Sequence, residues 1–562
     1  MIKSLIQKVI SDSYPDINFE VTTPDQKEFG HYSTNIAFVL GKKEKKNPNE
    51  IAKSIIETIK PKLEDKIEKT EVIGGYINFF LKNSYLREQL KNIFLDEKYL
   101  WNQAQIGKDK KVIIEYSSPN IAKPMHIGHL RSTIIGDALA NIYEYTGFNI
   151  IRWNFIGDWG TQFGKLIVAY KKWGEQKRLE ANPIPYLLEL YIRFHEELKN
   201  NPSLEKEGQF EFQKLENGDP ENKKLWEYFK IKSINEFNRI YEQLNIETDK
   251  MVFKGESDYE SKLKSIIDNL TQRDIAKESE GALIIELPDL PPAMLRKSDG
   301  ATLYLTRDLA SLEDRVEKKQ TKKILYVVAN QQALHFEQLF AVAKLLKIDA
   351  ELVHVKFGMV LGEDGKKLAT REGRVVLLQE VINKIEDLAI KTVKEKNPQL
   401  DESRSNEVAH AVAIGALKYN DLKQHPYSDI TFDWKAMLNL GGNSGPYIQY
   451  TFARLNNILE KGGQGETSHL ELLTDEQELN LISELLNFPE IIKQCVQLNT
   501  ANSLALYLYH LASKANHFYE TIRILDDQET ARKMARLVLI KSVAQILEQG
   551  LNLLGIKALK RI

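Results

Sequence analysis

Residues 110–136, KKVIIEYSSPNIAKPMHIGHLRSTIIG, predict a strand, a polar loop and the beginning of a helix, in that order. Residues 112–114 are an apolar, β-branched run that is typical of a buried strand. Residues 117–120, Ser-Ser-Pro-Asn, are rich in turn formers and end that strand. A helix should begin near Met125, because apolar residues then recur at helical spacing as far as Ile135. Backbone N–H groups at the start of such a helix are free to bind phosphate.

Two histidines, His126 and His129, stand three positions apart on one face of the first helical turn. Gly128 between them leaves the helix surface bare, so a flat ring could lie against it. A zinc-binding pair on a helix is usually spaced by four and needs further ligands, so a metal site is disfavoured. A buried structural pair is one alternative. The sharper hypothesis is a pair of donors that stabilises charge on a nucleotide phosphate during displacement.

The composition limits the classes of protein to consider. A chain of 562 residues is too long for one core and predicts three or four domains. Its 77 Lys and Arg against 79 Asp and Glu give a net charge of −2. This balance does not by itself indicate binding to nucleic acid, but it allows a local basic face that could bind it. The single cysteine, Cys495, excludes a disulfide framework and a cysteine-based zinc site. Lysines interrupt the apolar residues at the N-terminus, and no apolar run approaches membrane-spanning length, so we expect a soluble cytoplasmic protein.

Residues 1–107 are expected to form a small α+β module. A helix with a proline at its first position is predicted from residue 48. Residues 67–81 alternate apolar and polar side chains and predict a strand broken at Gly74-Gly75. Tyr76 and Asn78 would share one face of that strand. Either this face offers a stacking surface to RNA bases, or both faces of the strand are buried.

Residues 108–375 are expected to form a domain around a parallel sheet. A second strand is predicted at residues 150–151, followed by a tight Gly-Asp-Trp-Gly loop at 157–160 and another helix. Strand, crossover helix and strand predict a doubly wound sheet, in which ligands bind at the carboxyl ends of the strands. Residues from about 170 to 290 are rich in Glu, Lys and Asn at helical spacing, and predict a helical insertion with solvent-exposed charges.

Polar side chains should gather at that edge of the sheet. The strand pattern returns at residues 282–287 and 324–328, which places Asp308 and Gln332 in the same layer as Glu115 and Asn120. Tyr304 precedes Asp308 by four positions. Carboxylates that converge with amide and phenol groups would suit a planar guanidinium, although spacing alone leaves this as one hypothesis among several.

The last third of the chain predicts a basic hairpin and then helices. Residues 352–375 predict a strand and a hairpin turning at 363–365, followed by a basic loop with Lys366, Lys367, Arg371 and Arg374. Glycines in this loop would let it move over a phosphate-bearing ligand, but an ordinary surface hairpin has the same pattern. Residues 376–562 carry apolar stripes at helical spacing and predict an α-helical bundle as a second large domain.

These residues, taken together, resemble a known family. His126-Ile127-Gly128-His129 matches the HIGH signature of class I aminoacyl-tRNA synthetases, and residues 117–164, SSPNIAKPMHIGHLRSTIIGDALANIYEYTGFNIIRWNFIGDWGTQFG, resemble arginyl-tRNA synthetases. The likeness continues through YVVANQQALHFEQLF, FGMVLGEDGKKLATREG and GPYIQYTFARL, so it spans most of the chain. The resemblance implies a mixed α/β and all-α multidomain fold. A Rossmann-like parallel-sheet catalytic domain with helical insertions would lie between an N-terminal α+β module and a C-terminal α-helical bundle.

The resemblance also implies an activity. The enzyme would attach L-arginine to its cognate tRNA, tRNA(Arg), at the expense of ATP, in protein synthesis. Arginine would attack the α-phosphate of ATP to give arginyl-adenylate and pyrophosphate, and the 2′-hydroxyl of the terminal adenosine would then take the arginyl group and release AMP. ATP would enter with Mg²⁺, and no protein-bound zinc or other metal site is expected. A monomer, in which tRNA binds before arginine is activated, is usual in the family.

By motif position, the resemblance assigns residues to three binding tasks. The arginine site would contain Glu115, Ser117, Asn120, Tyr304, Asp308 and Gln332. The ATP site would contain His126, Gly128, His129, Met359, Val360 and Lys367. The N-terminal module would contact the D-arm of the tRNA through Tyr76 and Asn78, and the bundle at 376–562 would read the anticodon.

The chain departs from the class at its second signature loop. This loop is normally Lys-Met-Ser-Lys-Ser, whereas residues 367–371 are Lys-Leu-Ala-Thr-Arg. Many arginyl enzymes depart here too, and Lys123, three residues before His126, is thought to supply the missing charge. The resemblance therefore implies a catalytic group of His126, His129, Lys123, Lys367 and Arg371, with the division of phosphate contacts among the three basic residues left open.

Three other functions share parts of the pattern. A nucleotidylyltransferase that does not act on tRNA shares the HIGH signature but would not need two RNA-binding modules. Another synthetase of the class is disfavoured by the loop at residues 120–123. A paralogue that binds RNA without catalysis is disfavoured by the intact His126, His129, Glu115 and Asp308. Charging assays with arginine, ATP and bulk tRNA separate these functions.

Overall fold

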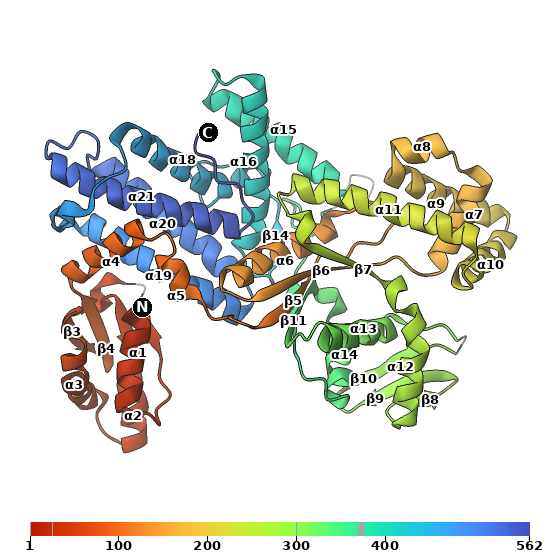
Figure 1. Cartoon of the computed structure of the whole chain (residues 1–562), viewed down its shortest axis with the longest axis horizontal. Coiled ribbons are helices and arrows are strands. Elements are labelled where there is room, and N and C mark those ends of the chain that lie inside the picture. Colours follow the sequence, from red (N-terminus) through yellow and green to blue (C-terminus); the bar gives the residue numbers. More distant parts are fainter. Residues whose placement is uncertain (1, 25, 299, 369–375) are drawn as a thin grey trace.

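A five-stranded parallel sheet stands at the centre of the molecule (Figure 1). The computed structural model describes residues 2–24, 26–298, 300–368 and 376–562. The sheet has the order β12-β11-β5-β6-β7, and every neighbouring pair in it is parallel. Its strands are β5 (Lys111–Glu115), β6 (Asn149–Ile156), β7 (Met251–Gly255), β11 (Lys323–Ala329) and β12 (Glu351–Phe357). The strand order reverses between β5 and β11, so the predicted doubly wound sheet is confirmed.

Both faces of the sheet are buried. Side chains alternate along β5, so that Val112 and Ile114 join one hydrophobic cluster while Ile113 joins another. The first cluster lies under α6 (Ile127–Tyr145), the helix that carries the HIGH signature. The second lies against α13 (Tyr304–Glu313) and α14 (Ala333–Leu345). The apolar run at residues 112–114 therefore belongs to a strand that is packed on both of its faces.

A helical insertion is predicted over residues from about 170 to 290. The structure differs from this prediction in the part that follows residue 250. Helices fill the first part, as expected: α7 (Thr161–Trp173), α8 (Gln176–Ala181), α9 (Pro183–Asn200), α10 (Ser203–Glu216) and α11 (Pro220–Gln243). The turn η3 (Thr248–Lys250) then leads into β7, which is the edge strand of the central sheet. This strand has only five residues, and so short a run carries little period by which to distinguish strand from helix.

A small layer of its own follows β7. It consists of η4 (Glu256–Tyr259), α12 (Glu260–Gln272) and an antiparallel sheet of β8 (Lys277–Ser279), β9 (Ala282–Leu287) and β10 (Leu290–Arg296). The strand predicted at 282–287 is therefore correct in type but does not belong to the central sheet. Helix α13 continues into a π-helical turn, η5 (Asp314–Lys318), and β11 continues into η6 (Asn330–Gln332). Asp308 thus lies inside α13, and the prediction that it follows the carboxyl end of a strand is wrong.

The N-terminal module is an antiparallel sheet covered by helices. Its sheet order is β1-β2-β4-β3, with Gly74 and Gly75 at positive φ in the turn between β3 and β4. The predicted broken strand is therefore a hairpin. The elements are α1 (Ile2–Ser13), β1 (Val21–Thr22), η1 (Lys27–Phe29), β2 (Tyr32–Thr34), α2 (Ile36–Glu44), α3 (Pro48–Ile59), η2 (Lys60–Lys62), β3 (Ile67–Ile73) and β4 (Tyr76–Leu81).

The C-terminal part is the predicted helical bundle. Its helices are α15 (Leu378–Lys396), α16 (Glu402–Leu422), α17 (Trp434–Met437), α18 (Gly445–Gly462), α19 (Glu476–Leu498), α20 (Asn502–Thr521) and α21 (Thr530–Leu553), with η7 (Thr467–Leu472) before α19. One short strand, β14 (Ile430–Thr431), leaves the bundle and pairs in parallel with β13 (Val360–Leu361). The bundle therefore contributes backbone next to the central domain.

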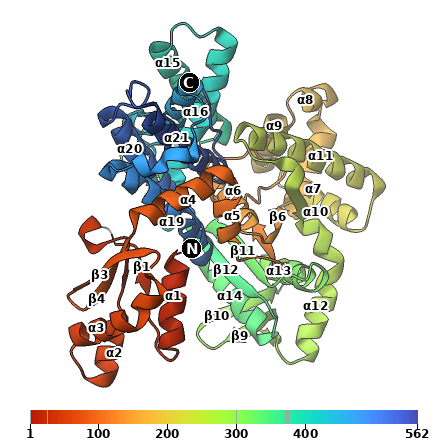
Figure 2. The ribbon, with the colours of Figure 1, turned by 60° about the vertical axis from the view of Figure 1, so that its left-hand side comes forward.

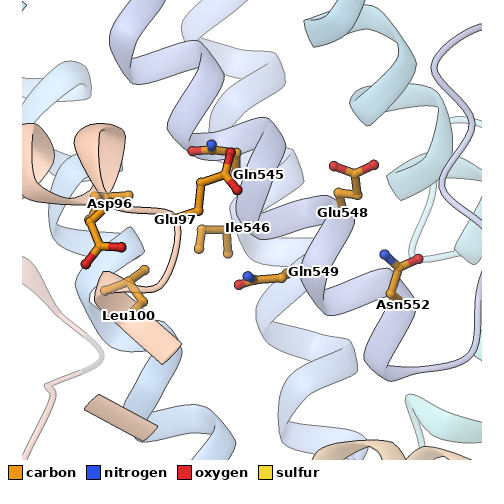
Figure 3. Close-up of a pocket in the computed structure, with 9 residues that line it drawn as sticks. Asp96, Glu97, Leu100, Gln545, Ile546, Glu548, Gln549 and Asn552 are labelled. Atoms are coloured by element: carbon orange, nitrogen blue, oxygen red, sulfur yellow. The ribbon is translucent and has the colours of Figure 1, made fainter. Parts of the chain in front are cut away.

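Two helices join the N-terminal module to the bundle. Figure 2 shows α4 (Asn83–Leu95) and α5 (Tyr99–Ala104) between them, and both pack against α19. A pocket of about 190 Å³ opens where this connection meets α21 (Figure 3). The carboxylates of Asp96, Glu97 and Glu548 line it, so the pocket would repel a phosphate backbone. Within the described residues, no helix has both the length and the hydropathy that crossing a membrane requires.

Candidate active site

The HIGH signature forms the first turn of α6, where its two histidines cap the helix. His126 is the N-cap residue, and its Nδ1 accepts a hydrogen bond from the backbone N–H of Gly128 at 3.0 Å. Nδ1 of His129 accepts in turn from the backbone N–H of His126, also at 3.0 Å. The two ring centroids are 4.0 Å apart. This reciprocal arrangement satisfies two backbone donors that a helix start leaves free.

The capping bonds determine which ring nitrogens remain for a ligand. Burial and the charge of Lys367 lower the pKa of His126, and burial, with the charge of His126, lowers the pKa of His129 to about 3. Both rings are therefore neutral near pH 7. A neutral imidazole whose Nδ1 accepts a hydrogen bond carries its proton on Nε2. Each histidine thus keeps one Nε2–H donor for a ligand.

Gly128 is required by its neighbour's ring. A Cβ at this position would come within 2.8 Å of Cε1 and 2.9 Å of Nδ1 of His126. The ring of His126 therefore lies against Gly128. Any larger residue here would push His126 out of its capping position.

The loop between β5 and α6 has a strained backbone. Ser117, Ser118 and Ala122 have positive φ values of 70°, 47° and 58°, a region that such residues rarely adopt. Their backbone N–H groups are held by the side chains of Ser132, Asn154 and Ser233 respectively. Strain of this kind persists only where the surroundings enforce it, and it clusters at functional sites.

Two of the residues assigned to this loop lie in different environments. Ser117 is buried, and its hydroxyl shares hydrogen bonds with Tyr241 at 2.7 Å and Thr133 at 2.9 Å. Asn120 is exposed and bridges to Gly157 in the Gly-Asp-Trp-Gly loop. A Cβ on Gly157 would come within 1.9 Å of Oδ1 of Asn120, so the two loops touch closely. Asn120 can reach a ligand, whereas the Ser117 hydroxyl is already engaged.

Four charged side chains gather at the switch point between β5 and β11. Glu115, at the end of β5, forms a buried ion pair with Arg315. Asp308 accepts a hydrogen bond from Nε2 of His335 at 2.6 Å. The charges of Asp308 and His335 both act on Glu115, so the two pairs are neighbours. Burial raises the pKa of Glu115, and the guanidinium of Arg315 opposes that rise.

Sequence reasoning missed one acidic residue of this group. Glu256 follows β7 directly, and burial, together with the nearby carboxylates of Asp308, Asp158 and Glu260, raises its pKa to about 8, although Arg307 opposes this. The only signal was the short run Met-Val-Phe-Lys-Gly before it, which had been assigned to the helical insertion.

The turn that carries Glu256 is fixed by a buried aspartate. Asp158, from the Gly-Asp-Trp-Gly loop, accepts from the backbone N–H of Ser257 at 2.9 Å and from its hydroxyl at 2.7 Å. Lys230 of α11 donates to the same carboxylate at 2.5 Å. The insertion therefore supports the carboxyl edge of the sheet.

The remaining candidates for small ligands lie around this edge. Tyr304 and Gln332 are exposed, at the starts of α13 and α14. Met359 is partly exposed, and its backbone N–H donates to Oδ1 of Asp429 at 2.6 Å, whereas Val360 is buried.

The phosphate candidates are spread over separate elements. Lys123 lies 5.5 Å from the ring centroid of Tyr191, and Lys367 is exposed and bridges to Leu361. Arg371 and Arg374 lie outside the described residues.

The two candidates for tRNA contact differ in exposure. Tyr76 is 46% exposed and its ring packs edge-on against Phe38 at 4.9 Å. Asn78 is 1% exposed, and its Nδ2 has no hydrogen-bond partner among the described residues. Tyr76 can stack with a base as it stands, whereas Asn78 would first have to be uncovered. Among the described residues, no group of three or more His, Cys, Asp or Glu is arranged to hold a metal ion.

Comparison with known proteins covers the whole chain. The family model for the catalytic domain of class I tRNA synthetases (R) matches residues 89–434, the DALR anticodon binding domain matches 448–562, and the arginyl-tRNA synthetase N-terminal domain matches 1–81. The arginine–tRNA ligase of Clostridioides difficile is 42% identical over 568 residues, which cover 100% of this chain and 99% of the relative. Arginine–tRNA ligase 1 of Bacillus cereus is 42% identical over 96% of this chain and 94% of its own.

Solved structures are similar over the same length. The arginyl-tRNA synthetase of Plasmodium falciparum superimposes with a TM-score of 0.82 at 29% identity, covering 100% of this chain and 98% of that one. The Thermus thermophilus arginyl-tRNA synthetase has a TM-score of 0.84 at 24% identity over 100% of both chains, which shows the shared fold. Family models, relatives and architecture agree along the full sequence, and the chain belongs to the arginyl-tRNA synthetase family of class I aminoacyl-tRNA synthetases.

Proposed function

We propose that the enzyme joins L-arginine to its cognate tRNA in two steps at the carboxyl edge of the central sheet. In the first step the carboxylate of arginine attacks the α-phosphorus of ATP, which forms arginyl-adenylate and releases pyrophosphate. In the second step the 2′-hydroxyl of the terminal adenosine attacks the arginyl carbonyl carbon and releases AMP. The observation that carries this proposal is that β5, which ends at Glu115 in the acidic cluster, leads through one loop to a helix start whose two histidines keep an Nε2–H donor each.

The nucleotide half of the site would be built on α6 and β13. Negative phosphate oxygens are favoured at a helix N-terminus, where His126 and His129 would each donate from Nε2. These donors are in place before the reaction, so they can stabilise charge that develops at the α-phosphate without reorganising. Met359 and Val360 would lie beside the adenine, held in place by the bond from Met359 to Asp429.

The arginine half would use the acidic cluster. Asp308 and Glu115 would receive the guanidinium and the α-amino group, in an order that the proposal leaves open. Glu256 would add a third carboxylate, which is consistent with a ligand that brings positive charge to a buried site. Asn120, Tyr304 and Gln332 would supply neutral polar contacts, whereas Ser117 would act mainly by shaping the loop.

Basic residues and Mg²⁺ would balance the triphosphate. Mg²⁺ keeps several waters and commonly binds through substrate phosphates, so it would arrive with ATP and need no protein cage. Lys123, Lys367 and Arg371 would share the remaining phosphate contacts.

On the tRNA side, Tyr76 would stack in the D-arm, and the bundle would contact the anticodon. We propose that the chain works as a monomer.

The direct test is aminoacylation with arginine, ATP and bulk tRNA. We expect acid-precipitable charging with arginine and none with citrulline, which lacks the positive charge. Failure to charge any tRNA with arginine would overturn the proposal.

Pyrophosphate exchange with and without tRNA checks whether tRNA must bind before arginine is activated. Exchange at the full rate without tRNA would refute that requirement.

A variant tests the role of Lys123. Lys123→Ala should slow adenylate formation by about 10²-fold, the cost of losing one well-placed transition-state donor, while tRNA affinity stays within about twofold. Lys264→Ala, which removes a highly exposed lysine on α12, is the matched control and should change neither. Unchanged exchange by Lys123→Ala would show that this lysine does not replace the missing second lysine of the signature loop.

A further inference from the structure

The chain buries a guanidinium of its own beside the proposed arginine pocket. Arg315 is 1% exposed, and its Nη2 forms the ion pair with Oε2 of Glu115. Three aromatic rings surround the guanidinium carbon, at centroid distances of 4.8 Å for Trp153, 5.3 Å for Tyr326 and 5.6 Å for Phe155. Rings at these distances attract a cation and limit where it can lie. An enzyme expected to bind free arginine thus holds one arginine side chain permanently in an aromatic cage.

An unusual piece of backbone places this side chain. Arg315 lies in η5, the π-helical turn that continues α13, and it is the one buried residue of the turn at 314–318. Such turns are rare and frequently occur at functional sites. Helix α13 also carries Asp308, so one element delivers both Asp308 and the partner of Glu115.

Stability alone gives no reason to retain this pair. Desolvation of two buried charges can cancel the attraction between them, and apolar residues of similar volume often stabilise a protein equally well. In addition, Nε and Nη1 of Arg315 have no hydrogen-bond partner in the described part of the chain. The pair therefore fits a role in the site better than a role in folding.

The free oxygen of Glu115 suggests what that role is. The ion pair uses Oε2, which is buried and has Arg315 as its partner, whereas no hydrogen bond to Oε1 is found within the described residues. Glu115 stands beside Asp308, at the switch point where the ligands of doubly wound sheets bind. We propose that Arg315 is a positioning residue of the arginine pocket, which keeps Glu115 ionised and turned so that Oε1 receives an N–H donor of the substrate.

This inference rests on the proposed function and extends it. Arg315 itself would touch no substrate atom. Its contribution would be to balance the charge of a carboxylate that burial would otherwise neutralise, and to fix its orientation. The titratable groups that face the pair are Asp308 and His335 beside Glu115, and Tyr326 and Tyr259 beside Arg315.

The test measures arginine-dependent pyrophosphate exchange at saturating tRNA between about pH 6 and 9. Arg315→Met removes the charge but retains much of the length, and should raise the KM for arginine at least about tenfold at pH 7 while the KM for ATP stays within about twofold. The increase should deepen as the pH falls, because Glu115 without its partner takes up a proton at higher pH. Arg315→Lys retains a cation and should recover part of the affinity.

A second arginine, whose side chain is 12% exposed, provides the control. Arg536 of α21 pairs with Glu478 and Asp527 far from the pocket, so Arg536→Met should lower thermal stability and leave the KM for arginine unchanged. If Arg315→Met behaves in the same way, with its KM for arginine within about twofold of wild type at every pH, the pair is purely structural and the inference is wrong.

A double variant keeps the test decisive if Arg315→Met does not fold. Arg315→Met/Glu115→Gln removes both charges and should fold, with a raised KM for arginine that no longer depends on the protonation of Glu115. A double variant with wild-type KM would overturn the inference. Failure of the proposed function is distinguishable, because the wild-type enzyme itself would then show no arginine-dependent exchange.

Discussion

At the residue scale, the two histidines of the HIGH signature have divided their nitrogens between two tasks. Nδ1 of each ring is committed to the backbone of α6, so only Nε2 is left to act on a ligand. Asparagine and glutamine side chains can imitate these two nitrogens separately, since the amide of asparagine lies near the position of Nδ1 and that of glutamine near Nε2. The folding role and the catalytic role can therefore be removed one at a time.

His129 gives the clearest separation. His129→Asn can still accept from the backbone N–H of His126 but loses the distal donor, so it should fold normally and exchange pyrophosphate about 10²–10³-fold more slowly. His129→Ala loses the cap as well and should also be destabilised by about 1 kcal/mol. Thermal melts and exchange rates measured on both variants check this. Equal stability of the two variants would contradict the capping role.

The pair of His335 and Asp308 predicts a pH dependence. Burial alone would lower the pKa of His335, but the hydrogen bond and the charge of Asp308 outweigh burial and raise it above its usual value. The stability from this pair is therefore fully present below the ordinary histidine pKa of about 6.5 and is lost as pH rises through the raised value. Protonated His335 also competes with the substrate for Asp308, so the KM for arginine should fall as pH increases.

His335→Gln tests the origin of that dependence. The variant has no charge to compete, so its KM for arginine should lose the change that begins above about pH 6.5. A second change near pH 8 should remain, because Glu256, which also faces Asp308, has a pKa of about 8 and binds a cation better once ionised. The KM for arginine, measured against pH in the wild-type enzyme and in His335→Gln, tests this origin. An unchanged slope in the variant would mean that His335 does not control access to Asp308.

At the element scale, the site depends on how closely the loops after neighbouring strands approach each other. Gly255, the last residue of β7, lies against Asp158 from the loop after β6, and a Cβ there would come within 2.0 Å of Oδ2 of Asp158. The same carboxylate holds Ser257 and Lys230. Gly255 is thus needed for its lack of a side chain, because its backbone must approach a buried carboxylate.

Gly255→Ala should disturb this turn and with it Glu256. We expect a loss of about 1–3 kcal/mol in stability, the usual cost of forcing extra volume into a packed site, together with a raised KM for arginine. Gly441→Ala is the control, because the nearest heavy atom to its Cβ would be 3.6 Å away. Urea unfolding and exchange kinetics provide the two measurements. A Gly255→Ala enzyme with normal stability would show that the turn can relax without loss.

The same scale shows what the sequence could and could not predict. The strand, loop and helix at 110–136 were predictable because each has a strong local pattern: a β-branched run, turn formers, and helical spacing after proline. Strand β7 was not, because five residues at a sheet edge owe their conformation to the neighbouring β6. The run Thr-Leu-Tyr-Leu at 302–305 is rich in residues that strands favour and so predicts a strand before Asp308, whereas α13 begins at Tyr304. Arg315 could not be paired with Glu115, since contacts between residues so far apart in the sequence leave no periodic trace.

At the scale of the whole molecule, buried charges bind α6 to the bundle. Arg131 of α6 forms a buried pair with Asp421 of α16, donating from Nη2 to Oδ1 at 3.0 Å. It also donates to the backbone carbonyl of Ser428 at 2.8 Å and to that of Pro426 at 3.3 Å. The carbonyl of Pro426 accepts from Gly358 in turn, next to Met359. Part of the proposed adenine contact is therefore held by a loop of the bundle.

Asp421→Ala tests this connection. It leaves Arg131 buried without its counter-ion, which should cost about 3–5 kcal/mol of stability. In the folded fraction, the KM for ATP should increase several-fold while the KM for arginine changes little, because the loop at 424–429 holds Gly358 and Met359 on the nucleotide side. Asp401→Ala, which removes an exposed cap at the start of α16, is the control. Equal increases in both KM values would indicate general loosening instead.

A second buried pair strengthens the same junction. Lys418 of α16 lies 3.5 Å from Asp137 of α6 and donates at 2.9 Å to the carbonyl of Gly555, near the end of the chain. Removing one partner of a buried ion pair destabilises a protein, so a seam that such pairs cross cannot be parted without a loss of stability. Here each side of the seam would inherit an unpaired buried charge, so a foreign bundle grafted onto this sheet domain, or this sheet domain produced alone, would begin with a defect at the helix that bears its catalytic histidines. Helix α16 and the helix of the HIGH signature thus depend on each other for charge balance, and both lie within residues 89–434, which a single catalytic-domain model matches.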